Sequence, residues 1–444
     1  MASTYLSKTY GSDGNRKTMT FSFWIKRGNL STAQYPMSIF DSGSGNQADM
    51  RFAATTDVFR MYATGTDATP RVHLVTDRVF RDTSAWYHIV WEIDTTQATA
   101  SDRVKLYVNG VQETSFSTED YPPQNTDLRW NGTSGSTGGV NQIGAINGGN
   151  FIDGYMAHFH FIDGTAYDAS TFGETDATTG IWKPKTAPSV TYGTNGFFLK
   201  FENSAAFGTD SSGNSNNWTV NGTMTQTIDT PSNVFATYNP LLPVTVTFSN
   251  GNLTGVTSSN WECSASTIPV TKGKWYCEIN VVAIATGTVL IGVEDVDLIN
   301  VWQNQYVGIS ANGWGYWSSG GQKYNNNTFS AYGASYTVGD IIGIALDMDN
   351  KYVYFSKNGV FQNSGDPTSG ASGTGGLALS GTEYVFVASA LGGTLSANFG
   401  NGYFGTTAVS SAENPDDGIG IFEYAVPTGY KALCTKSINA QEYD

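Results

Sequence analysis

Hydrophobic and polar residues alternate along most of the chain, which is the pattern of strands with one buried face. Residues 21–26, 87–94, 104–108 and 155–161 each place large apolar side chains at every second position. Residues 196–202 predict another strand, and helical periodicity is nearly absent. Because successive side chains point to opposite faces of a strand, these segments predict half-buried antiparallel strands.

A second strand-rich block follows a proline-rich break at residues 229–244, which contains Pro231, Pro240 and Pro243. Proline removes a ladder donor, so the break predicts a linker or a domain edge. The predicted strands of the second block are 274–282, 288–295, 305–310, 313–317, 340–349, 351–360 and 383–389. Asn-Gly pairs at 109–110, 312–313 and 358–359 predict hairpin turns.

These segments predict an all-β fold of two antiparallel β-sandwich domains of the jelly-roll type in tandem. We expect the first sandwich at 1–235, a proline-containing linker at 236–245 and the second sandwich at 246–405. Residues 406–444 are less regular and predict a C-terminal tail that packs on the sandwiches.

The amino-acid composition argues against two classes of function, nucleic-acid binding and membrane insertion. The 444 residues include only 14% charged residues and 13% aromatic residues, and the net charge is −15. With 23 Lys and Arg, the chain lacks the basic surface that binds nucleic acid or anionic lipid. It contains neither an apolar run of about 20 residues nor an apolar core of a signal peptide near its start. We therefore expect neither nucleic-acid binding nor membrane insertion.

The three cysteines, Cys263, Cys277 and Cys434, are too few for a disulfide framework. We expect free thiols, and a Cys263–Cys277 bridge is the alternative if the two residues lie on neighbouring strands.

The first block resembles a laminin-G/concanavalin A-like lectin sandwich. The resemblance rests on FSFWIKRG at 21–28, the strand pair SAWYHIVWEID and RVKLYVNGV at 84–94 and 103–111, and DGYMAHFHFIDG at 153–164. The stretch DSSGNSNNW at 210–218 is similar to a short signature of the same family, in which it usually stands near the start of the domain.

The second block resembles a SPRY domain, a bent sandwich used for protein and ligand binding. GKWYCEINV at 273–281, IGVED at 291–295 and YTVGDIIGIALDMDNKYVYFSKNGV at 336–360 match the pattern of that family.

The combination also resembles structural proteins of tailed marine bacteriophages, through GETDATTGIWKPK at 173–185 and VPTGYKALCT at 426–435. This resemblance implies a non-enzymatic virion protein, a tail fibre or fibre-like appendage that attaches to a host-surface polysaccharide. It also implies synthesis in the host cytoplasm, exposure on the particle exterior, other virion proteins as partners and a homo-oligomer, with a trimer as one possibility.

The strongest candidate for catalysis is WEIDTTQ at 91–97. Laminarinase-type glycosidases of the same fold use Glu-x-Asp-x-x-Glu, because a retaining mechanism needs one nucleophile and one acid/base. Glu92 and Asp94 fit the first two positions, but Gln97 cannot transfer a proton. We therefore expect no enzymatic activity.

Metal binding has two candidate sets. His158 and His160 share a strand face at a spacing that suits zinc, but two ligands are too few. Calcium prefers oxygen ligands in loops, and its candidates are Asp41, Asp153, Asp163 and Asp210. Turn formation is the alternative role for these aspartates, and no cofactor is required by the sequence.

Exposed aromatic residues are the candidate ligand-binding groups, because the C–H faces of sugars stack on aromatic rings. The candidates are Trp130, Trp302, Trp314, Tyr316, Trp317 and Tyr324. Core packing is the alternative for each of them.

Three other functions remain open: a decoration protein of the capsid or tail that binds only other virion subunits, a glycan hydrolase, and a secreted adhesin. A hydrolase requires a third carboxylate facing Glu92 and Asp94 from another strand.

Overall fold

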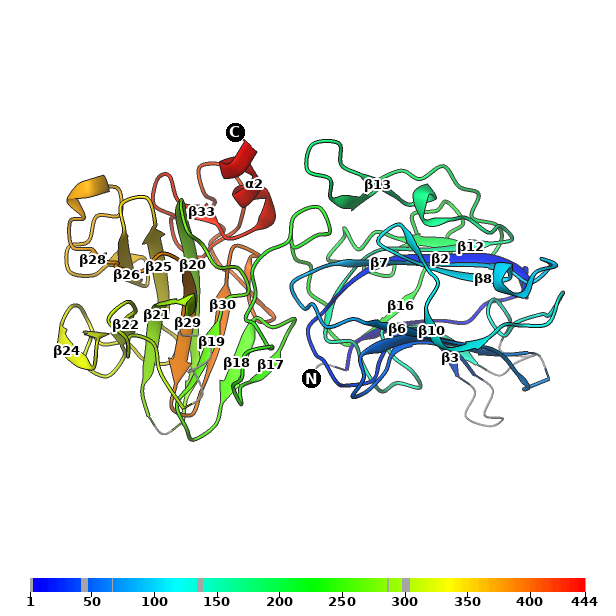
Figure 1. The fold of residues 1–444 in the computed structure, drawn as a ribbon, viewed down its shortest axis with the longest axis horizontal. Helices are drawn as coiled ribbons and strands as arrows, with labels where there is room; N and C mark the ends of the chain where they lie inside the picture. The colour runs from blue at the N-terminus through cyan, green and yellow to red at the C-terminus, as the bar shows by residue number, and fades with distance from the viewer. Residues whose placement is uncertain are drawn as a thin grey trace. The chain divides into compact units, whose positions relative to one another are not determined.

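The computed structural model describes residues 3–40, 47–65, 67–133, 139–285, 287–297 and 304–443. The chain divides into two compact units, Met1–Gln226 and Thr227–Asp444. Each unit is an antiparallel two-sheet sandwich, which confirms the predicted all-β fold (Figure 1).

The boundary between the units differs from the predicted one. The division falls at Gln226, before the expected end of the first sandwich at residue 235. Residues 236–245, which we expected as a linker, lie in the second unit, where Ala236 and Tyr238 are buried in the core. Pro240 lies in a turn. A turn tolerates proline, so Pro240 marks a bend of the packed chain and not a break between domains.

Unit 1 contains an eight-stranded and a six-stranded sheet among its described residues. In spatial order, the eight-stranded sheet consists of β10 (Phe116–Asp120), β6 (Pro70–Val79), β5 (Val58–Thr64), β4 (Gln47–Phe52), β3 (Gln34–Phe40), β11 (Val140–Ile143), β1 (Tyr5–Lys8) and β16 (Thr219–Asn221). The six-stranded sheet consists of β15 (Phe197–Leu199), β12 (Gly154–Asp163), β2 (Thr18–Arg27), β7 (Tyr87–Asp94), β8 (Val104–Val108) and β9 (Val111–Glu113). A short ribbon of β13 (Gly173–Thr175) and β14 (Trp182–Pro184) follows.

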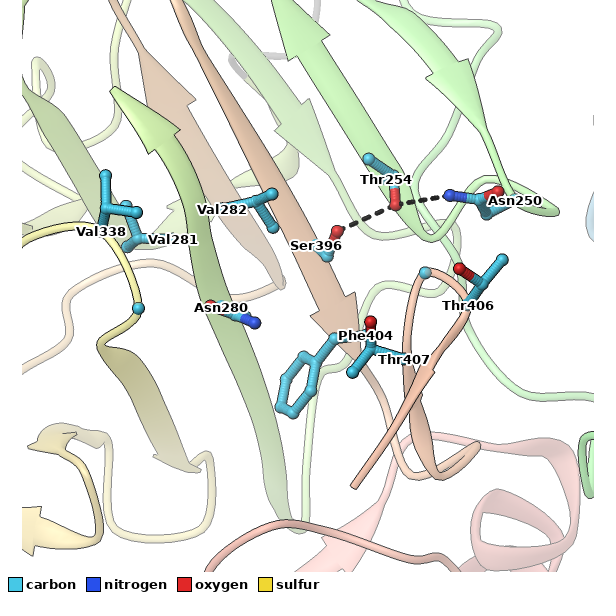
Figure 2. A pocket seen from close by; sticks show the side chains of 12 residues that line it. Asn250, Thr254, Asn280, Val281, Val282, Val338, Ser396, Phe404, Thr406 and Thr407 are labelled. Carbon is cyan, nitrogen blue, oxygen red and sulfur yellow. Dashed lines mark hydrogen bonds between the residues drawn. The ribbon is translucent and has the colours of Figure 1, made fainter. Parts of the chain in front are cut away.

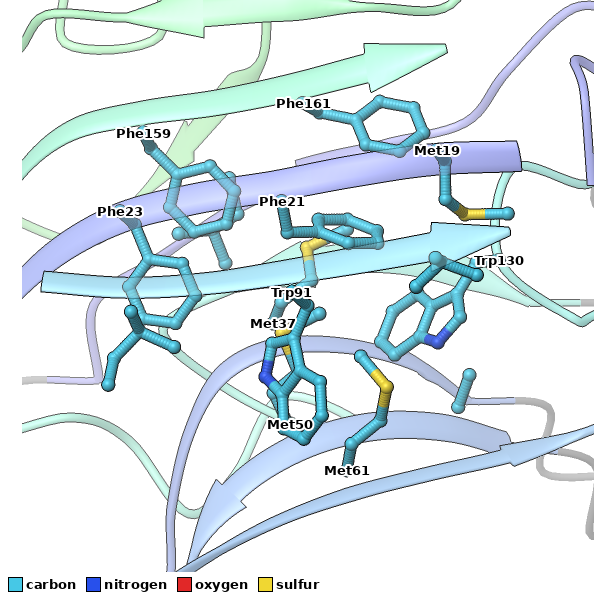
Figure 3. Close-up of a cluster of buried hydrophobic side chains, with 14 of the residues drawn as sticks. Met19, Phe21, Phe23, Met37, Met50, Met61, Trp91, Trp130, Phe159 and Phe161 are labelled. Carbon is cyan, nitrogen blue, oxygen red and sulfur yellow. The ribbon is translucent and has the colours of Figure 1, made fainter. Parts of the chain in front are cut away.

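The core of unit 1 fills the space between its two sheets (Figure 3). Phe21 stacks on Phe161 at a ring-centroid distance of 4.7 Å, and Phe23 stacks on Phe159 at 5.0 Å. The eight-stranded sheet contributes fully buried methionines, such as Met50, from the opposite side. The period-two pattern of the sequence therefore sorts these large side chains into one interior.

The first and last strands of unit 1 are neighbours in the eight-stranded sheet. β1 pairs with β16, with Ser7 opposite Thr219. The end of unit 1 therefore supplies an edge strand of this sheet, next to the first strand of the unit.

Unit 2 also contains two main sheets among its described residues. The larger sheet consists of β17 (Thr247–Ser249), β18 (Thr254–Thr257), β30 (Gly393–Asn398), β20 (Lys274–Ile284), β25 (Ile341–Asp347), β26 (Tyr352–Lys357) and β27 (Val360–Phe361), with β28 (Leu377–Ala378) on β26 and β33 (Lys431–Ala432) on β20. The smaller sheet consists of β19 (Glu262–Ala265), β29 (Tyr384–Ala390), β21 (Val289–Asp295), β22 (Trp314–Trp317), β23 (Gln322–Asn325) and β24 (Thr328–Ala331). A hairpin of β31 (Tyr403–Phe404) and β32 (Thr407–Ala408) follows the larger sheet along the chain.

The outer face of β20 holds the C-terminal segment. Glu278 is fully buried there and accepts hydrogen bonds from the backbone N–H groups of Glu423 and Tyr424, at 2.8 and 2.9 Å. Ala236 donates its N–H to the Leu433 carbonyl at 2.9 Å, so the beginning and the end of unit 2 also lie together. The tail packs on the second sandwich and ends in a helix, α2 (Thr435–Tyr443), which the sequence did not predict.

Two of the three Asn-Gly pairs that were predicted to form hairpin turns do so. Asn109–Gly110 and Asn358–Gly359 have positive φ at both residues, as a type I′ turn requires. Residues 312–313 instead end the long connection that joins β21 to β22, so this prediction was wrong. Three short 3₁₀ helices lie in the described loops, at Ala100–Asp102, Ala169–Thr171 and Gly370–Ser372. Within the described ranges, we find no helix that is both long and apolar enough to span a membrane.

Candidate functional site

The aromatic residues expected to bind a ligand lie mostly in the cores. Trp130 is fully buried between the sheets of unit 1 (Figure 3). Tyr316 is fully buried in the core of unit 2, where its hydroxyl donates to the Ala334 carbonyl, and Tyr324 is 2% exposed. These three residues cannot reach a surface ligand, which corrects the expectation from the sequence. The physical reason is that removing a large aromatic ring from water stabilises the folded chain, so such rings are usually buried in the core.

Two of the predicted tryptophans remain half-buried. Trp314 donates its indole N–H to the Ala378 carbonyl at 2.8 Å, and the Lys323 ammonium lies 5.6 Å from its ring centroid. Trp317 packs on the exposed Phe329 at a centroid distance of 4.4 Å. Tyr324 packs on the same Phe329 ring at 4.3 Å, so the structure brings Trp317 and Tyr324 into one cluster, whereas Trp314 packs against the separate core cluster that contains Tyr316. Trp302 lies outside the described residues.

The carboxylates of the glycosidase-like stretch are held by their neighbours. Glu92 accepts a hydrogen bond from the Tyr107 hydroxyl at 2.8 Å. Asp94 accepts from the Thr96 hydroxyl and from the Gln97 amide, both at 2.6 Å. Although partial burial acts in the opposite direction, these hydrogen bonds lower the pKa of Asp94. Gln97 thus completes a turn around Asp94 and stands where the glycosidase pattern has its third carboxylate.

The two histidines of β12 differ in environment. A bulge between Ala157 and His160 places His158 at a φ of 49°. His160 is buried, stacks on Phe198 at 3.9 Å and shares a hydrogen bond with the Tyr192 hydroxyl. Burial holds the pKa of His160 well below its usual value, which keeps the ring neutral.

Two of the calcium candidates, Asp163 and Asp210, accept hydrogen bonds that hold loops in place. Asp163 accepts hydrogen bonds from Asn15 N, Asn131 Nδ2 and Asn195 N, at 2.7, 2.7 and 2.9 Å. Asp210 accepts four hydrogen bonds within 210–216 and β15, which leaves its oxygens occupied.

Asp153 is half-buried before β12, and Asp41 lies outside the described residues. The described part of the chain contains no group of three or more His, Cys, Asp or Glu placed to hold a metal ion. Cys263, Cys277 and Cys434 are buried free thiols.

A row of polar and aromatic side chains crosses the outer face of the eight-stranded sheet of unit 1. Strand register places one residue of each of six neighbouring strands directly opposite the next. This polar row consists of Gln142, Ser38, Asp49, Tyr62, His73 and Asp120. Since neighbouring strands lie about 4.8 Å apart, the four members from Asp49 to Asp120 span roughly 14 Å.

An ion pair lies at the centre of the polar row. Asp49 is fully buried, and Arg60 Nη2 donates to both of its carboxylate oxygens at 2.7 Å. Burial raises the pKa of Asp49, and Arg60 opposes that shift. Arg51 Nη1 donates to the Tyr35 hydroxyl at 3.2 Å. The Nε atoms of both arginines are buried and donate to no acceptor among the described residues, so each retains an unused donor.

Two half-buried rings continue the polar row. Tyr62 and His73 pack edge to face at a centroid distance of 5.7 Å, and the Arg60 guanidinium lies 5.2 Å from the Tyr62 centroid. Partial burial and the nearby Arg60 lower the pKa of His73, so its imidazole is neutral at pH 7. The arrangement offers hydrogen-bond donors, acceptors and ring faces on a rigid sheet, which is the chemistry that recognises a polyhydroxylated ligand.

Sequence reasoning missed the polar row because its members are spread over residues 38–142. A local signal exists in ADMRF at 48–52 and FRMYA at 59–63, where charged or aromatic residues alternate with buried methionine and phenylalanine. Such alternation indicates a functional outer face only once the register of the two strands is known.

Comparisons with known proteins agree with this fold. Residues 2–170 match the model of the concanavalin A-like lectin/glucanases superfamily, and residues 274–386 match the SPRY domain model. A 99-residue stretch is 34% identical to the ATP-dependent RNA helicase DDX1 of Xenopus laevis and covers 22% of this chain and 12% of that protein. The chain therefore spans about one eighth of that curated relative.

Solved structures that match part of the chain include the SPRY domain of human HERC1, at 18% identity and a TM-score of 0.29, covering 36% of this chain and 96% of that one. A human SPRY domain matches at 18% identity and a TM-score of 0.27, covering 34% and 93%. The stonustoxin structure matches at 16% identity and a TM-score of 0.28, covering 37% and 27%.

Both matched families are binding-type folds, which indicates a binding or adhesion role for the protein. The chain carries a concanavalin A-like lectin domain followed by a SPRY domain.

Proposed function

We propose that the chain is a non-enzymatic structural protein of a phage virion, a tail fibre or fibre-like appendage that attaches to a host-surface polysaccharide. The polar row of the lectin domain is the observation that carries the attachment function. The assignment to a virion rests on the segments at 173–185 and 426–435 that resemble phage structural proteins.

The polar row suits a glycan for a physical reason. A sugar hydroxyl both donates and accepts hydrogen bonds, and the row supplies the phenol of Tyr62 and the neutral imidazole of His73, next to the Arg60 guanidinium. The Tyr62 ring supplies an apolar face for the C–H groups of the same sugar. The net charge of −15 favours uncharged or weakly charged polysaccharides over strongly acidic ones.

The test uses the full chain, labelled with a fluorophore, on an array of bacterial capsular polysaccharides and lipopolysaccharide O-antigens. We expect selective binding that Tyr62→Ala weakens about tenfold, as removal of an aromatic anchor from a binding surface does. Tyr107→Ala is the matched control, because Tyr107 is a half-buried tyrosine on the outer face of the other sheet of unit 1. Absence of binding to every polysaccharide, or equal losses in both variants, would contradict the glycan assignment.

The virion assignment has a separate test. Immunogold labelling of the particle with an antibody against the chain is expected to mark a tail fibre. Labelling over the capsid, together with no glycan binding, would instead favour a decoration protein that contacts only other virion subunits. Particles without label would reject both virion roles.

A further inference from the structure

A pocket of about 350 Å³ opens on the outer face of the larger sheet of unit 2 (Figure 2). The hairpin of β31 and β32 borders the pocket on the same face of β20 on which the C-terminal segment covers Glu278. Its volume is within the range of small-molecule sites, which begins at roughly 300 Å³.

The floor of the pocket is a polar cross-strand row. Thr254 of β18 lies opposite Ser396 of β30, which lies opposite Asn280 of β20. Thr254 Oγ1 accepts a hydrogen bond from Asn250 Nδ2 at 3.1 Å and shares another with Ser396 Oγ at 2.8 Å. The two hydroxyls and two amides thus point into the same space (Figure 2).

Asn280 carries an unused acceptor. Its Oδ1 atom is buried and accepts a hydrogen bond from none of the residues that the structure describes. A buried acceptor without a donor is destabilising, so such an atom in a native pocket calls for a donor from a ligand or from water.

The walls of the pocket are uncharged and combine apolar side chains with the hairpin residues Thr406 and Thr407. Phe404 closes one side, and the backbone of Gly405 passes so close to Thr254 that an added Cβ would lie 2.6 Å from Thr254 Oγ1. Val282 and Val338 stand on the other side with exposed fractions of 45% and 50%. All lining residues in the described part of the chain are uncharged.

We propose that this pocket binds a neutral 6-deoxyhexose unit of a glycan. The ring hydroxyls of such a sugar match Asn280, Ser396 and Thr254. Its C5 methyl group, which replaces the hydroxymethyl group of an ordinary hexose, matches the exposed methyl groups of Val282 and Val338. The inference deepens the proposed attachment function by adding a second site, in the SPRY domain, to the polar row of the lectin domain.

The test measures the dissociation constants of methyl α-L-rhamnoside and methyl α-L-fucoside for the full chain by ligand-observed NMR. The corresponding L-mannoside and L-galactoside, which differ only by the C6 hydroxyl, serve as reference ligands. We expect one deoxy sugar to bind roughly tenfold tighter than its hydroxylated parent, as one small apolar group in an apolar site does. Absence of binding for all four glycosides at millimolar concentration would overturn the inference.

Two variants locate the binding. Val282→Thr exchanges a methyl group for a hydroxyl and is expected to abolish the preference for the deoxy sugar. Asn280→Ala is expected to weaken both sugars several-fold. Val256→Thr is the matched control, because Val256 is 41% exposed on the outer face of the same sheet but does not line the pocket. Equal affinities in the wild type and in Val282→Thr would place the sugar elsewhere.

The same variants separate this inference from the proposed function. If Val282→Thr and Asn280→Ala leave all sugar binding intact while Tyr62→Ala removes array binding, the pocket assignment fails and the lectin-domain assignment stands. If the deoxy sugar binds in the pocket but Tyr62→Ala does not alter array binding, the pocket assignment stands and the polar row fails.

Discussion

The buried carboxylate of Glu278 predicts that the stability of unit 2 depends on pH. Its oxygens accept hydrogen bonds from the backbone of Glu423 and Tyr424, from Asn398 Nδ2 and from the Tyr276 hydroxyl. Burial nevertheless outweighs these hydrogen bonds and raises the pKa of Glu278 to about 7. Replacement by glutamine removes the titration but keeps the shape of the side chain.

The size of the effect follows from the difference between the folded and unfolded states. The ordinary pKa is 4.5, so between pH 4.5 and pH 7 the folded chain binds more protons at Glu278 than the unfolded chain. The free energy of unfolding therefore falls as the pH rises through this window, and it levels off above pH 7. At about 1.4 kcal/mol for each pH unit, the loss amounts to about 3 kcal/mol, a large share of a typical domain stability.

The assay compares the wild type with Glu278→Gln by urea unfolding at several pH values between 4.5 and 8. Other carboxylates titrate in both proteins, so the difference between the two pH profiles isolates Glu278. Hydrogen exchange at the amides of Glu423 and Tyr424 gives a local readout, because both amides donate to this carboxylate. Faster exchange of these amides at pH 7 than at pH 5 in the wild type, relative to the variant, is expected.

The absolute stability of Glu278→Gln is a poor measure, because the amide nitrogen would face N–H donors and add its own cost. The pH profile does not share this weakness. Parallel profiles of wild type and variant over the whole range would refute the reasoning, since they would show equal proton binding at Glu278 in the folded and unfolded states.

Three further outcomes are expected. Phe159→Ala removes a fully buried ring of the unit 1 core and should lower the free energy of unfolding by about 3–5 kcal/mol in urea unfolding, whereas no loss would contradict the core assignment. Arg27→Met removes the buried guanidinium 3.1 Å from the Asp57 carboxylate and leaves the exposed Arg81, 3.2 Å away, as its remaining ion-pair partner, so it should cost about 3 kcal/mol in the same assay; recovery in a double variant with Asp57→Asn would support the pairing. Millimolar calcium should leave the thermal midpoint unchanged, because Asp163 and Asp210 already hold backbone and side-chain donors, and a clear upward shift would refute this assignment of their oxygens.

The sequence predicted the strands well because alternation is a local property. FSFWIK at 21–26 and the segment at 155–161 became adjacent strands with their phenylalanines inside. The hairpin at Asn109–Gly110 could also be predicted from a local signal, because an Asn-Gly pair readily adopts the positive φ angles that this turn requires. The pair at 312–313 failed because its flanking strands do not pair across it.

The binding surfaces could not be predicted in the same way. Alternation shows that a strand has two faces, but not which face meets the opposite sheet. Trp314 and Tyr316 share the core-facing side of β22, yet Tyr316 is fully buried whereas Trp314, at the first position of the strand, is half-buried, and alternation gives no measure of this depth. The polar row needs the register of six strands, and the pocket of unit 2 needs the approach of the hairpin at Phe404 to β20. Both depend on long-range pairing that no window of the sequence contains.

The meeting of the two ends within each unit bears on how such chains are assembled in evolution. Ser7 lies opposite Thr219 in unit 1, and Phe235 bridges to Cys434 in unit 2. A module that starts and finishes at one place can be spliced into a surface loop of another fold without stretching either partner. Each unit can therefore be replaced as a whole by recombination. Such an exchange changes the binding specificity of one unit and leaves the fold of the other unit unchanged.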